Sequence, residues 1–184
     1  MIKNNLKFKP LILRKKNVYL KYFNDKNITQ DFLNSINNKN INEFLEIKKN
    51  LITKKDAKKY FINNKKKNFY YFSLNSSQNV FFGTALINYF SPSEVIMGIL
   101  IHKKKFWSSI YSEEAFQIIL FFCFKILKIK KIISKIKKKN IRSIKKFKKY
   151  DFIKFNENNF HNFYSLDKKL YKFEKDIIFS FDKE

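Results

Sequence analysis

MGILIHKKKFWSSIYSEEAFQIILFFCFKILKIKKIISKIKKKNIRSIKKFKKYDF runs from residue 97 to residue 152, and the architecture of the chain can be worked out from it. It contains an apolar strand, a loop with the only tryptophan, a long apolar helix, a second strand and a short helix that begins at an asparagine. A strand that ends in a loop opening onto a helix aims several backbone N–H groups at one point, as a pyrophosphate requires. The stretch therefore predicts a phosphate-binding loop between the first strand and the long helix.

Length and composition predict one folded domain. The 184 residues are enough for one domain with a full core and few for two. Hydrophobic residues make up 45% of the chain and aromatic residues 18%, so it can bury a large apolar area. We therefore expect a single domain over residues 1–184.

The formal net charge of +25 raises the question of a polyanionic partner. Clustered basic residues supply the sequence-independent part of nucleic-acid binding, so a lysine-rich polyanion-binding module is one hypothesis. However, Arg14 and Arg142 are the only arginines, and the chain is rich in Lys, Ile, Asn and Phe but has only two Gly and two Pro. This bias is typical of A/T-rich codons, whereas proteins that bind phosphates in a bidentate manner or recognise bases favour arginine for these contacts. We therefore favour compositional drift over a specific nucleic-acid partner, although the positive field would still attract nucleotide-linked ligands.

Three features predict a cytoplasmic location. Cys123, the single cysteine, can form no internal disulfide and lies in an apolar run, where a buried, unreactive thiol is expected. The N-terminus lacks the apolar run of about 7 to 15 residues that a signal peptide contains. The longest apolar stretch, residues 115–127, is interrupted by Gln117 and Lys125 and is shorter than the roughly 20 residues of a membrane span. We expect neither secretion nor membrane insertion.

The spacing of apolar residues predicts the order of the secondary-structure elements. Strands are expected over residues 18–23, 69–74, 80–89, 94–101, 129–136, 152–155 and 163–173. Helices are expected near residues 28–33 and 40–47, from residue 53 onward, and over 111–127 and 140–149. Such an order makes an α/β or α+β domain with a mixed sheet.

The loop sequence Lys105-Phe106-Trp107-Ser108-Ser109-Ile110 resembles that of the GNAT superfamily of acetyl-CoA-dependent N-acetyltransferases. In this superfamily the loop reads Gln or Arg, two residues, Gly, one residue, then Gly or Ala, with amides pointed at the CoA pyrophosphate. Here Ser108 and Ile110 replace the two small residues, and the β-branched Ile110 narrows the room for a phosphate. The resemblance implies a GNAT-like mixed, mostly antiparallel sheet of about six to seven strands, flanked by about four to five helices.

Three further matches strengthen the resemblance. The start of the long helix is similar to the branch signature Trp-Gly-Lys-Gly-Tyr-Ala-Thr-Glu-Ala at Trp107, Tyr111, Glu114 and Ala115. The run from Asn140 to Phe152 is similar to Asn-x-x-Ser-Ile-x-x-x-Glu-Lys-x-Gly-Phe, with Lys148 in place of Glu and Asp151 in place of Gly. The two glycines, Gly83 and Gly98, fall on expected strands where the superfamily also has glycine.

The N-terminal half resembles one branch of the superfamily. GNAT proteins of surface-polysaccharide and amino-sugar biosynthesis have motifs similar to those at residues 18–21, 28–33, 37–46 and 53–60. Lys21, Ile36 and Asn38 depart from the usual Tyr-Leu-Arg and Trp-Leu-Asn-Asp of that branch. The resemblance, which covers residues 11–155, implies transfer of acetyl to the amine of a nucleotide-linked amino sugar. RimJ/RimL-type acetylation of protein N-termini remains an alternative, because it shares much of the pattern.

The resemblance also implies where acetyl-CoA binds. The cofactor is expected in a splay between the strand that ends at Ile101 and the strand that begins near Ile129. Pantetheine would pair with the strand backbone and the pyrophosphate with the loop, while two polar side chains of the last helix would bind the pantetheine and phosphate arms. The cofactor-binding residues implied in this way are Ile99, Leu100, Ile101, Lys105, Phe106, Trp107, Ser108, Ser109, Ile110, Asn140 and Ser143. We expect no metal, because His102 and His161 have no Cys or carboxylate partners at ligand spacing.

Several residues are candidates for the catalytic groups. A base must take a proton from the acceptor ammonium. Relatives often have a carboxylate two residues before the strand glycine, where this chain has Ile96, and Glu94 shares the face of Ile96 by strand alternation. Glu46 comes from the helical region that lines the acceptor side in the superfamily, so Glu46 and Glu94 are candidates, with a solvated surface charge as the alternative for each. Many relatives protonate the leaving thiolate with a tyrosine where this chain has Phe147, so Tyr111, Tyr150 or solvent would have to replace it. A weakly active or inactive homologue is therefore a further alternative. We expect a small-molecule amine as the acceptor, and a monomer or homodimer.

Overall fold

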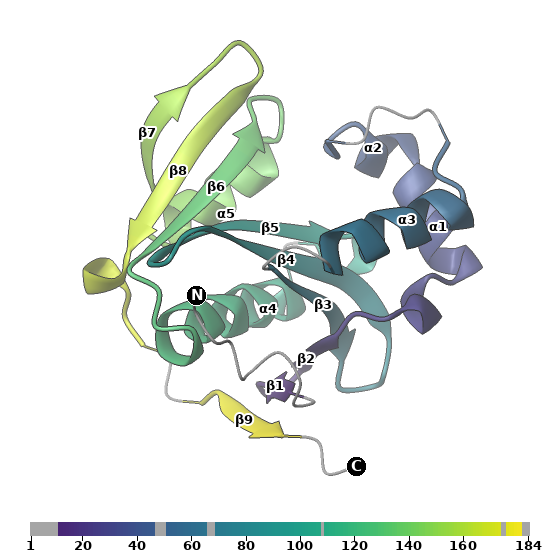
Figure 1. Ribbon diagram of the computed structural model, residues 1–184, viewed down its shortest axis with the longest axis horizontal. Coiled ribbons are helices and arrows are strands. Elements are labelled where there is room, and N and C mark those ends of the chain that lie inside the picture. The colour runs from purple at the N-terminus through teal and green to yellow at the C-terminus, as the bar shows by residue number, and fades with distance from the viewer. Residues whose placement is uncertain (1–10, 47–50, 66–68, 108, 174–175, 182–184) are drawn as a thin grey trace.

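One continuous sheet forms the centre of the computed structural model (Figure 1). The structure describes residues 11–46, 51–65, 69–107, 109–173 and 176–181. The strands are β1 (Leu11–Arg14), β2 (Val18–Tyr22), β3 (Phe69–Ser76), β4 (Phe81–Ser91), β5 (Glu94–Ile101), β6 (Lys131–Lys137), β7 (Ile153–Glu157), β8 (His161–Asp167) and β9 (Ile178–Phe181). Their order across the sheet is β7-β8-β6-β5-β4-β3-β2-β1-β9. β5 and β6 run parallel, and the other neighbouring strands are antiparallel.

Five α-helices accompany the sheet in the described ranges. They are α1 (Gln30–Asn37), α2 (Lys39–Asn42), α3 (Lys54–Lys65), α4 (Ile110–Phe121) and α5 (Ile141–Lys149). The hydroxyl of Thr29 accepts a hydrogen bond from the N–H of Phe32 and caps α1, as expected from its position. Thr53 and Asp56 form a reciprocal pair of hydrogen bonds at the start of α3. Short side chains that cap helices thus confirm two of the helix starts expected from the sequence.

The larger core lies on the face of the sheet that carries α4 (Figure 1). Ile118 and Ile119 of α4 are fully buried, and the ring of Phe122 meets that of Phe72 of β3 edge-on at 4.9 Å. α5 joins this face, because Phe147 packs edge-on against Phe116 of α4 at 4.9 Å. Burial of apolar side chains from both helices therefore holds them against one side of the sheet.

A second, smaller core lies under α1 and α3 on the opposite face. It contains Phe23, Phe32, Leu33, Ile36 and Ile52, with Leu100 of β5 packed against them. Because side chains alternate along a strand, Leu100 faces this core while Met97 is buried in the α4 core. The sheet is therefore covered by different helices on its two sides, and β5 contributes to both cores.

The expected helix over 111–127 is confirmed as α4, but its last part has a different geometry. Regular α-helix ends at Phe121, and a π-helical turn, η4 (Phe122–Ile126), follows. Lys128 then adopts a left-handed backbone conformation with φ of 56°. The apolar pattern of residues 115–127 cannot distinguish an α-turn from a π-turn, since hydrophobic periodicity is averaged over a window longer than one turn.

The expectation of six to seven strands is wrong, since the sheet has nine. The two additional strands are β1 and β9, which pair with each other in antiparallel fashion at one edge. Each is four residues long, too short for a clear alternation of polar and apolar residues, and they come from opposite ends of the chain. Separately, none of the helices in the described ranges is long and apolar enough to cross a membrane.

Candidate functional site

The parallel strands β5 and β6 pair over a short distance and then separate. Their register joins residues 94–96 of β5 to residues 131–133 of β6. Ser134, the next residue of β6, is buried and donates a hydrogen bond from its Oγ to the main-chain carbonyl of Met97 at 2.8 Å. Beyond this bond the two strands leave a gap.

The edge of β5 that faces this gap carries backbone groups without a strand partner in the described residues. The carbonyls of Met97 and Ile101 point into the gap, since they accept hydrogen bonds from Ser134 and from Nε1 of Trp107, the latter at 2.7 Å. Successive residues of a strand direct their backbone groups to alternate sides, so the N–H and C=O of Ile99 face the gap as well. An open strand edge of this kind can pair with an extended ligand that carries amide groups.

A cleft of about 180 Å³ lies along this edge. Its lining comes from residues 40–45, the end of β5, α4 and α5: Asn40, Ile41, Phe44, Leu45, Ile99, Leu100, Ile101, Trp107, Ser112, Phe116, Asn140, Arg142, Ser143, Lys146 and Phe147. The wall is mainly apolar with a few polar groups, as in most small-molecule sites. Six of the cofactor-binding residues predicted from the sequence meet here: Ile99, Leu100, Ile101, Trp107, Asn140 and Ser143.

The loop before α4 contributes less of its side chains than expected. Phe106 is a core residue whose ring stacks on Phe82 at 4.5 Å, and Lys105 is exposed. The hydroxyl of Ser109 donates to the carbonyl of Phe106 at 2.7 Å, and the Ser109 side chain makes no capping hydrogen bond at the start of α4. Ile110 is the first residue of α4 and is 56% exposed, while Ser108 lies outside the described residues. The backbone N–H groups of the first turn of α4 therefore have no side-chain acceptor from its N-cap.

The start of α5 faces the cleft beside Trp107. The side chain of Asn140 caps this helix by accepting a hydrogen bond from the N–H of Ser143 at 3.2 Å. The guanidinium group of Arg142 lies over the indole ring of Trp107, 4.0 Å from its centroid. Stacking on an aromatic face is favourable for a guanidinium, so Arg142 is held at the cleft with its charge available.

Lys146 is a second cation of the cleft, and it belongs to a network between α4 and α5. Its Nζ bonds to Oε1 of Glu113 at 2.5 Å and to the hydroxyl of Ser112 at 3.2 Å, and the hydroxyl of Tyr150 donates to Oε2 of Glu113 at 2.7 Å. Partial burial raises the pKa of Glu113, but the hydrogen bonds from Lys146, Tyr150 and Lys149 outweigh it and hold the pKa below its usual value. Glu113 therefore stays ionised and fixes Lys146.

Arg142 and Lys146 were not among the site residues expected from the sequence. In a chain with 40 basic residues, a single lysine carries no signal of its own. The signal for Arg142 was its residue type, because only two arginines occur in the chain.

The tyrosines considered as proton donors lie away from the cleft lining. Tyr111 packs edge-on against Phe106, 5.0 Å between ring centroids, and Tyr150 is bonded to Glu113. Phe147 lines the cleft at the position where relatives have a tyrosine. Its ring supplies no proton, so no side chain at that position serves as the acid.

The structure does not bring Glu94 to the cleft. It stands at the first residue of β5, where β5 and β6 are still paired, and forms a 3.8 Å ion pair with Lys131. The strand alternation that placed Glu94 on the face of Ile96 says nothing about distance along the strand, and Ile99 is five residues further on.

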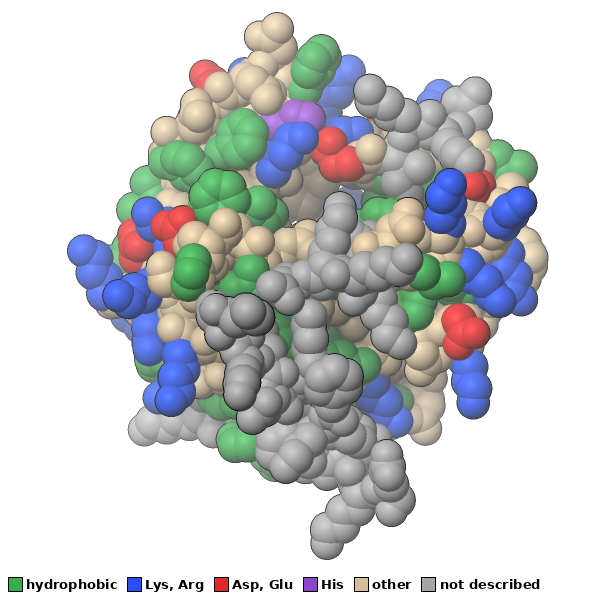
Figure 2. Space-filling model, viewed as in Figure 1, with side chains coloured by type: hydrophobic (Ala, Val, Ile, Leu, Met, Phe, Trp, Pro, Cys, Tyr) green, Lys and Arg blue, Asp and Glu red, His purple; other side chains and the backbone are tan. Residues whose placement is uncertain are grey.

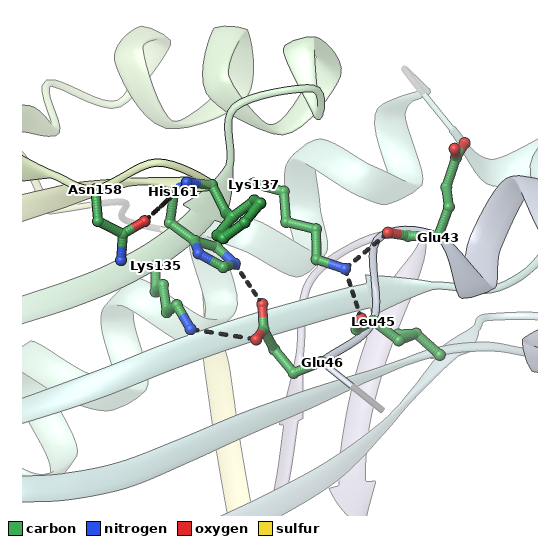
Figure 3. Close-up of polar contacts among 8 residues, drawn as sticks. Glu43, Leu45, Glu46, Lys135, Lys137, Asn158 and His161 are labelled. Carbon is green, nitrogen blue, oxygen red and sulfur yellow. Dashed lines mark hydrogen bonds and ion pairs between the residues drawn. The ribbon is translucent and has the colours of Figure 1, made fainter. Parts of the chain in front are cut away.

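Glu46 lies between residues 40–45 and the strands β6 and β8 (Figure 3). Its Oε1 meets Nε2 of His161 at 2.7 Å and its Oε2 meets Nζ of Lys135 at 3.2 Å. Partial burial raises the pKa of Glu46, but the hydrogen bonds from Lys135 and His161 outweigh it and hold the pKa below its usual value. Glu46 is thus a fixed carboxylate next to Leu45, which lines the cleft.

The histidines show no metal chemistry in the described part of the chain. No group of three or more His, Cys, Asp or Glu side chains gathers there in a way that could hold a metal ion. His102 is buried between the rings of Phe32 and Phe81, and neither ring nitrogen has a hydrogen-bond partner among the residues that the structure describes. Burial, together with the nearby Lys103, lowers the pKa of His102 to about 4, so it is neutral in the core.

Known proteins share this fold. The family model of the acetyltransferase (GNAT) domain matches residues 8–153. FdhC, described as a nucleotide-linked sugar GNAT, has 21% identity and a TM-score of 0.72, over 87% of this chain and 92% of that chain. The spermidine N-acetyltransferase from Vibrio cholerae, solved with CoA and spermine, has 12% identity and a TM-score of 0.70, over 84% of this chain and 97% of that chain.

A third solved structure, the GNAT-family acetyltransferase from Bacillus anthracis, has 16% identity and a TM-score of 0.71, over 86% of this chain and 99% of that chain. No curated protein sequence matches the chain. At these identities the structural similarities show the fold alone, and the match to the family model shows the family.

Proposed function

Because the chain belongs to the GNAT acetyltransferase family, we propose that it is an N-acetyltransferase that transfers acetyl from acetyl-CoA to the amine of a nucleotide-linked amino sugar. The observation that carries the proposal is the gap between β5 and β6. There the backbone of Ile99 faces a cleft and has no strand partner on that side in the described residues. GNAT enzymes use acetyl-CoA, whose pantetheine arm has two amides that suit such an edge.

The cofactor would run along β5 toward the start of α4. The N–H and C=O of Ile99 and the N–H of Ile101 are the backbone groups left for pantetheine, because Trp107 already holds the carbonyl of Ile101. The uncapped first turn of α4, with Arg142 and Lys146 near it, would take the diphosphate. The positive charge of Arg142 and Lys146 would offset the narrower room for a phosphate that Ile110 leaves at the loop.

The reaction needs few groups from the protein. The amine nitrogen attacks the thioester carbonyl carbon, the C–S bond breaks, and CoA leaves as a thiolate while the amine loses a proton. A backbone N–H at the end of β5 would stabilise the oxyanion. The acceptor would approach between residues 43–46 and the strands β6 and β8, a region called the acceptor side below, where Glu46 is the available carboxylate. Solvent would protonate the thiolate, because Phe147 stands where a tyrosine is usual.

The charge of the acceptor side favours an anionic acceptor. Lys135 and Lys137 are two residues apart on β6, so their side chains lie on one face of the strand, and Lys135 pairs with Glu46. Lys137 bonds to two main-chain carbonyls and has no carboxylate partner among the described residues. Basic side chains also surround the face shown in Figure 2, with few acidic ones between them. A diphosphate-bearing substrate suits this surface, whereas a polyamine would be repelled.

A binding experiment tests the cofactor first. Acetyl-CoA should raise the melting temperature, since a ligand that binds only the folded state stabilises it by about 2.7 kcal/mol at a hundredfold excess over Kd. No shift at millimolar acetyl-CoA would contradict the proposal. A parallel titration with nucleic acid at rising salt tests the alternative of a polyanion-binding module. In that case the affinity for nucleic acid should fall steeply with salt, and acetyl-CoA should not compete with the nucleic acid.

An acceptor panel then tests the substrate class. Nucleotide-linked amino sugars, spermidine and short peptides with free N-termini are compared by release of the CoA thiol. Cys123 does not interfere in the folded protein, because it is fully buried and burial raises the pKa of its thiol. Thiol release with peptides but not with amino sugars would assign the chain to the RimJ/RimL type instead.

A further inference from the structure

Residues 43–46, called the 43–46 segment below, bridge two walls of the molecule on the acceptor side. The side chains of Phe44 and Leu45 line the cleft from this segment. Nζ of Lys137 at the end of β6 donates to the main-chain carbonyls of Glu43 and Leu45, each at 2.8 Å. These bonds satisfy carbonyls that follow the short helix α2 and hold its end against β6 (Figure 3).

The second attachment of the segment is the carboxylate of Glu46. It spans to β8 through His161 and to β6 through Lys135, so both of its oxygens are engaged (Figure 3). His161 is itself held in place, since its main-chain N–H donates to Oδ1 of Asn158 at 2.8 Å in the β7–β8 hairpin. The imidazole of His161, fixed on the hairpin, therefore donates to the carboxylate of Glu46 on the 43–46 segment.

The two donors to Glu46 differ in strength. The side chain of His161 is 10% exposed and that of Lys135 is 39% exposed. An exposed lysine pair is screened by solvent and loses side-chain entropy, so it contributes little. The short, nearly buried imidazole is already ordered and loses less on making its shorter bond. His161 is therefore the main restraint on the Glu46 carboxylate.

We propose that His161 is a positioning residue for acetyl transfer, whose imidazole aims the Glu46 carboxylate and keeps the 43–46 segment closed over the cleft. The proposal rests on the proposed function in that Glu46 serves the acceptor amine. The charged and titratable groups that face Glu46 are Lys135 and Lys137 from β6 and His161 from β8. Glu43 belongs to the segment itself.

Three variants and one matched control test the proposal. His161→Ala removes the donor, and His161→Gln puts an amide nitrogen near the position of Nε2. Glu46→Ala removes the acceptor at an exposed site, where the fold tolerates truncation. The control is Glu157→Gln. Glu157 lies on the same β7–β8 hairpin as His161, pairs with Lys154 of β7 and with Lys138 just after β6, and has no contact with the 43–46 segment among the described residues.

The first measurement needs neither substrate nor activity. Trp107 is the only tryptophan and lines the same cleft as Phe44 and Leu45, so acrylamide quenching of its fluorescence reports opening of the segment. The quenching constant should rise in His161→Ala and in Glu46→Ala, and stay at the wild-type value in Glu157→Gln. His161→Gln should restore most of the protection.

The second measurement is the pH profile of kcat/KM for the acceptor. Loss of one charge-assisted hydrogen bond should lower kcat/KM roughly tenfold in His161→Ala, with little change in acetyl-CoA binding. The hydrogen bonds from Lys135 and from His161 together hold the pKa of Glu46 below its usual value, so loss of the imidazole should raise this pKa and move the acidic limb to higher pH. His161→Gln should bring the limb back toward the wild-type position, which a merely structural role does not predict.

Each failure has a distinct meaning. Unchanged quenching in both alanine variants contradicts closure by the Glu46–His161 contact. An acidic limb that stays in place in His161→Ala contradicts the positioning role. Absence of acetyl transfer by the wild-type protein contradicts the proposed function, and the quenching data then still report whether the contact closes the segment.

Discussion

Ser134 of β6 and Met97 of β5 are joined by a hydrogen bond of 2.8 Å from the serine hydroxyl to the main-chain carbonyl, at the point where the two strands separate. The bond follows directly after the last paired residues, Ile96 and Ile133. It satisfies a carbonyl whose strand partner has turned away, so the sheet can open without leaving a buried acceptor unpaired. The gap in which we propose that the cofactor binds thus begins at a side chain of the protein's own core.

Ser134→Ala should therefore lower the free energy of unfolding by about 1 to 3 kcal/mol, because it leaves the Met97 carbonyl without its donor. Urea denaturation measures the change. Ser165→Ala on the adjacent strand β8 is the control, since Ser165 lies opposite Ile133 and has no comparable hydrogen bond among the described residues. An equal loss in both variants would show that the Ser134 bond has no special role.

The two glycines should respond differently to alanine. A Cβ on Gly83 would lie 2.6 Å from the main-chain oxygen of Leu100, while a Cβ on Gly98 would have nothing within 4 Å. Gly83→Ala should destabilise by about 1 to 3 kcal/mol through overpacking, and Gly98→Ala should stay within about 1 kcal/mol of wild type. Thermal unfolding separates them.

Gly98→Ala has a second expected effect. Its Cβ would project on the face that Ile96 and Leu100 share, which is the face of β5 that we propose to lie toward the acceptor. The variant should therefore raise KM for the acceptor while acetyl-CoA still shifts the melting temperature. Unchanged kinetics would place the acceptor away from this part of the strand.

Asn140→Asp should keep α5 folded and weaken acetyl-CoA binding. Aspartate caps a helix as well as asparagine does, so the hydrogen bond to the Ser143 N–H is retained. The added negative charge near Arg142 would repel the diphosphate, and the loss of the amide N–H removes a donor worth about 0.5 to 1.5 kcal/mol. Thermal shift with acetyl-CoA measures binding, and normal binding would exclude this end of α5 from the site.

His102 should make the protein less stable in mild acid. Its pKa is lowered to about 4 in the folded chain, while an unfolded histidine titrates near 6.5. As pH falls from about 6.5 to 4, the unfolded state takes up a proton that the folded state does not, and stability should drop by about 2 to 4 kcal/mol.

His102→Leu should remove most of this acid dependence, because a leucine of similar size fits between Phe32 and Phe81 without a group to protonate. Denaturation midpoints at several pH values provide the comparison. The same pH dependence in the variant would assign it to other groups.

The sequence by itself determined the elements whose signals are local. Side-chain caps at Thr29 and Asn140 mark helix starts, and the apolar spacing predicts β3, β4 and β5 as consecutive strands. Caps and alternation depend on neighbours within a few residues, so they can be read without a fold. The family could be recognised for the same reason, since its motifs are short.

Only the tertiary structure decided which distant residues meet. Glu46 and His161 are 115 residues apart in sequence and form a hydrogen bond, whereas Glu94, a candidate base by strand alternation, lies at the paired end of β5. The pairing of β1 with β9 likewise joins the two ends of the described chain. Contacts of this kind depend on how whole elements pack, and neither periodicity nor spacing encodes the distance between side chains on different elements.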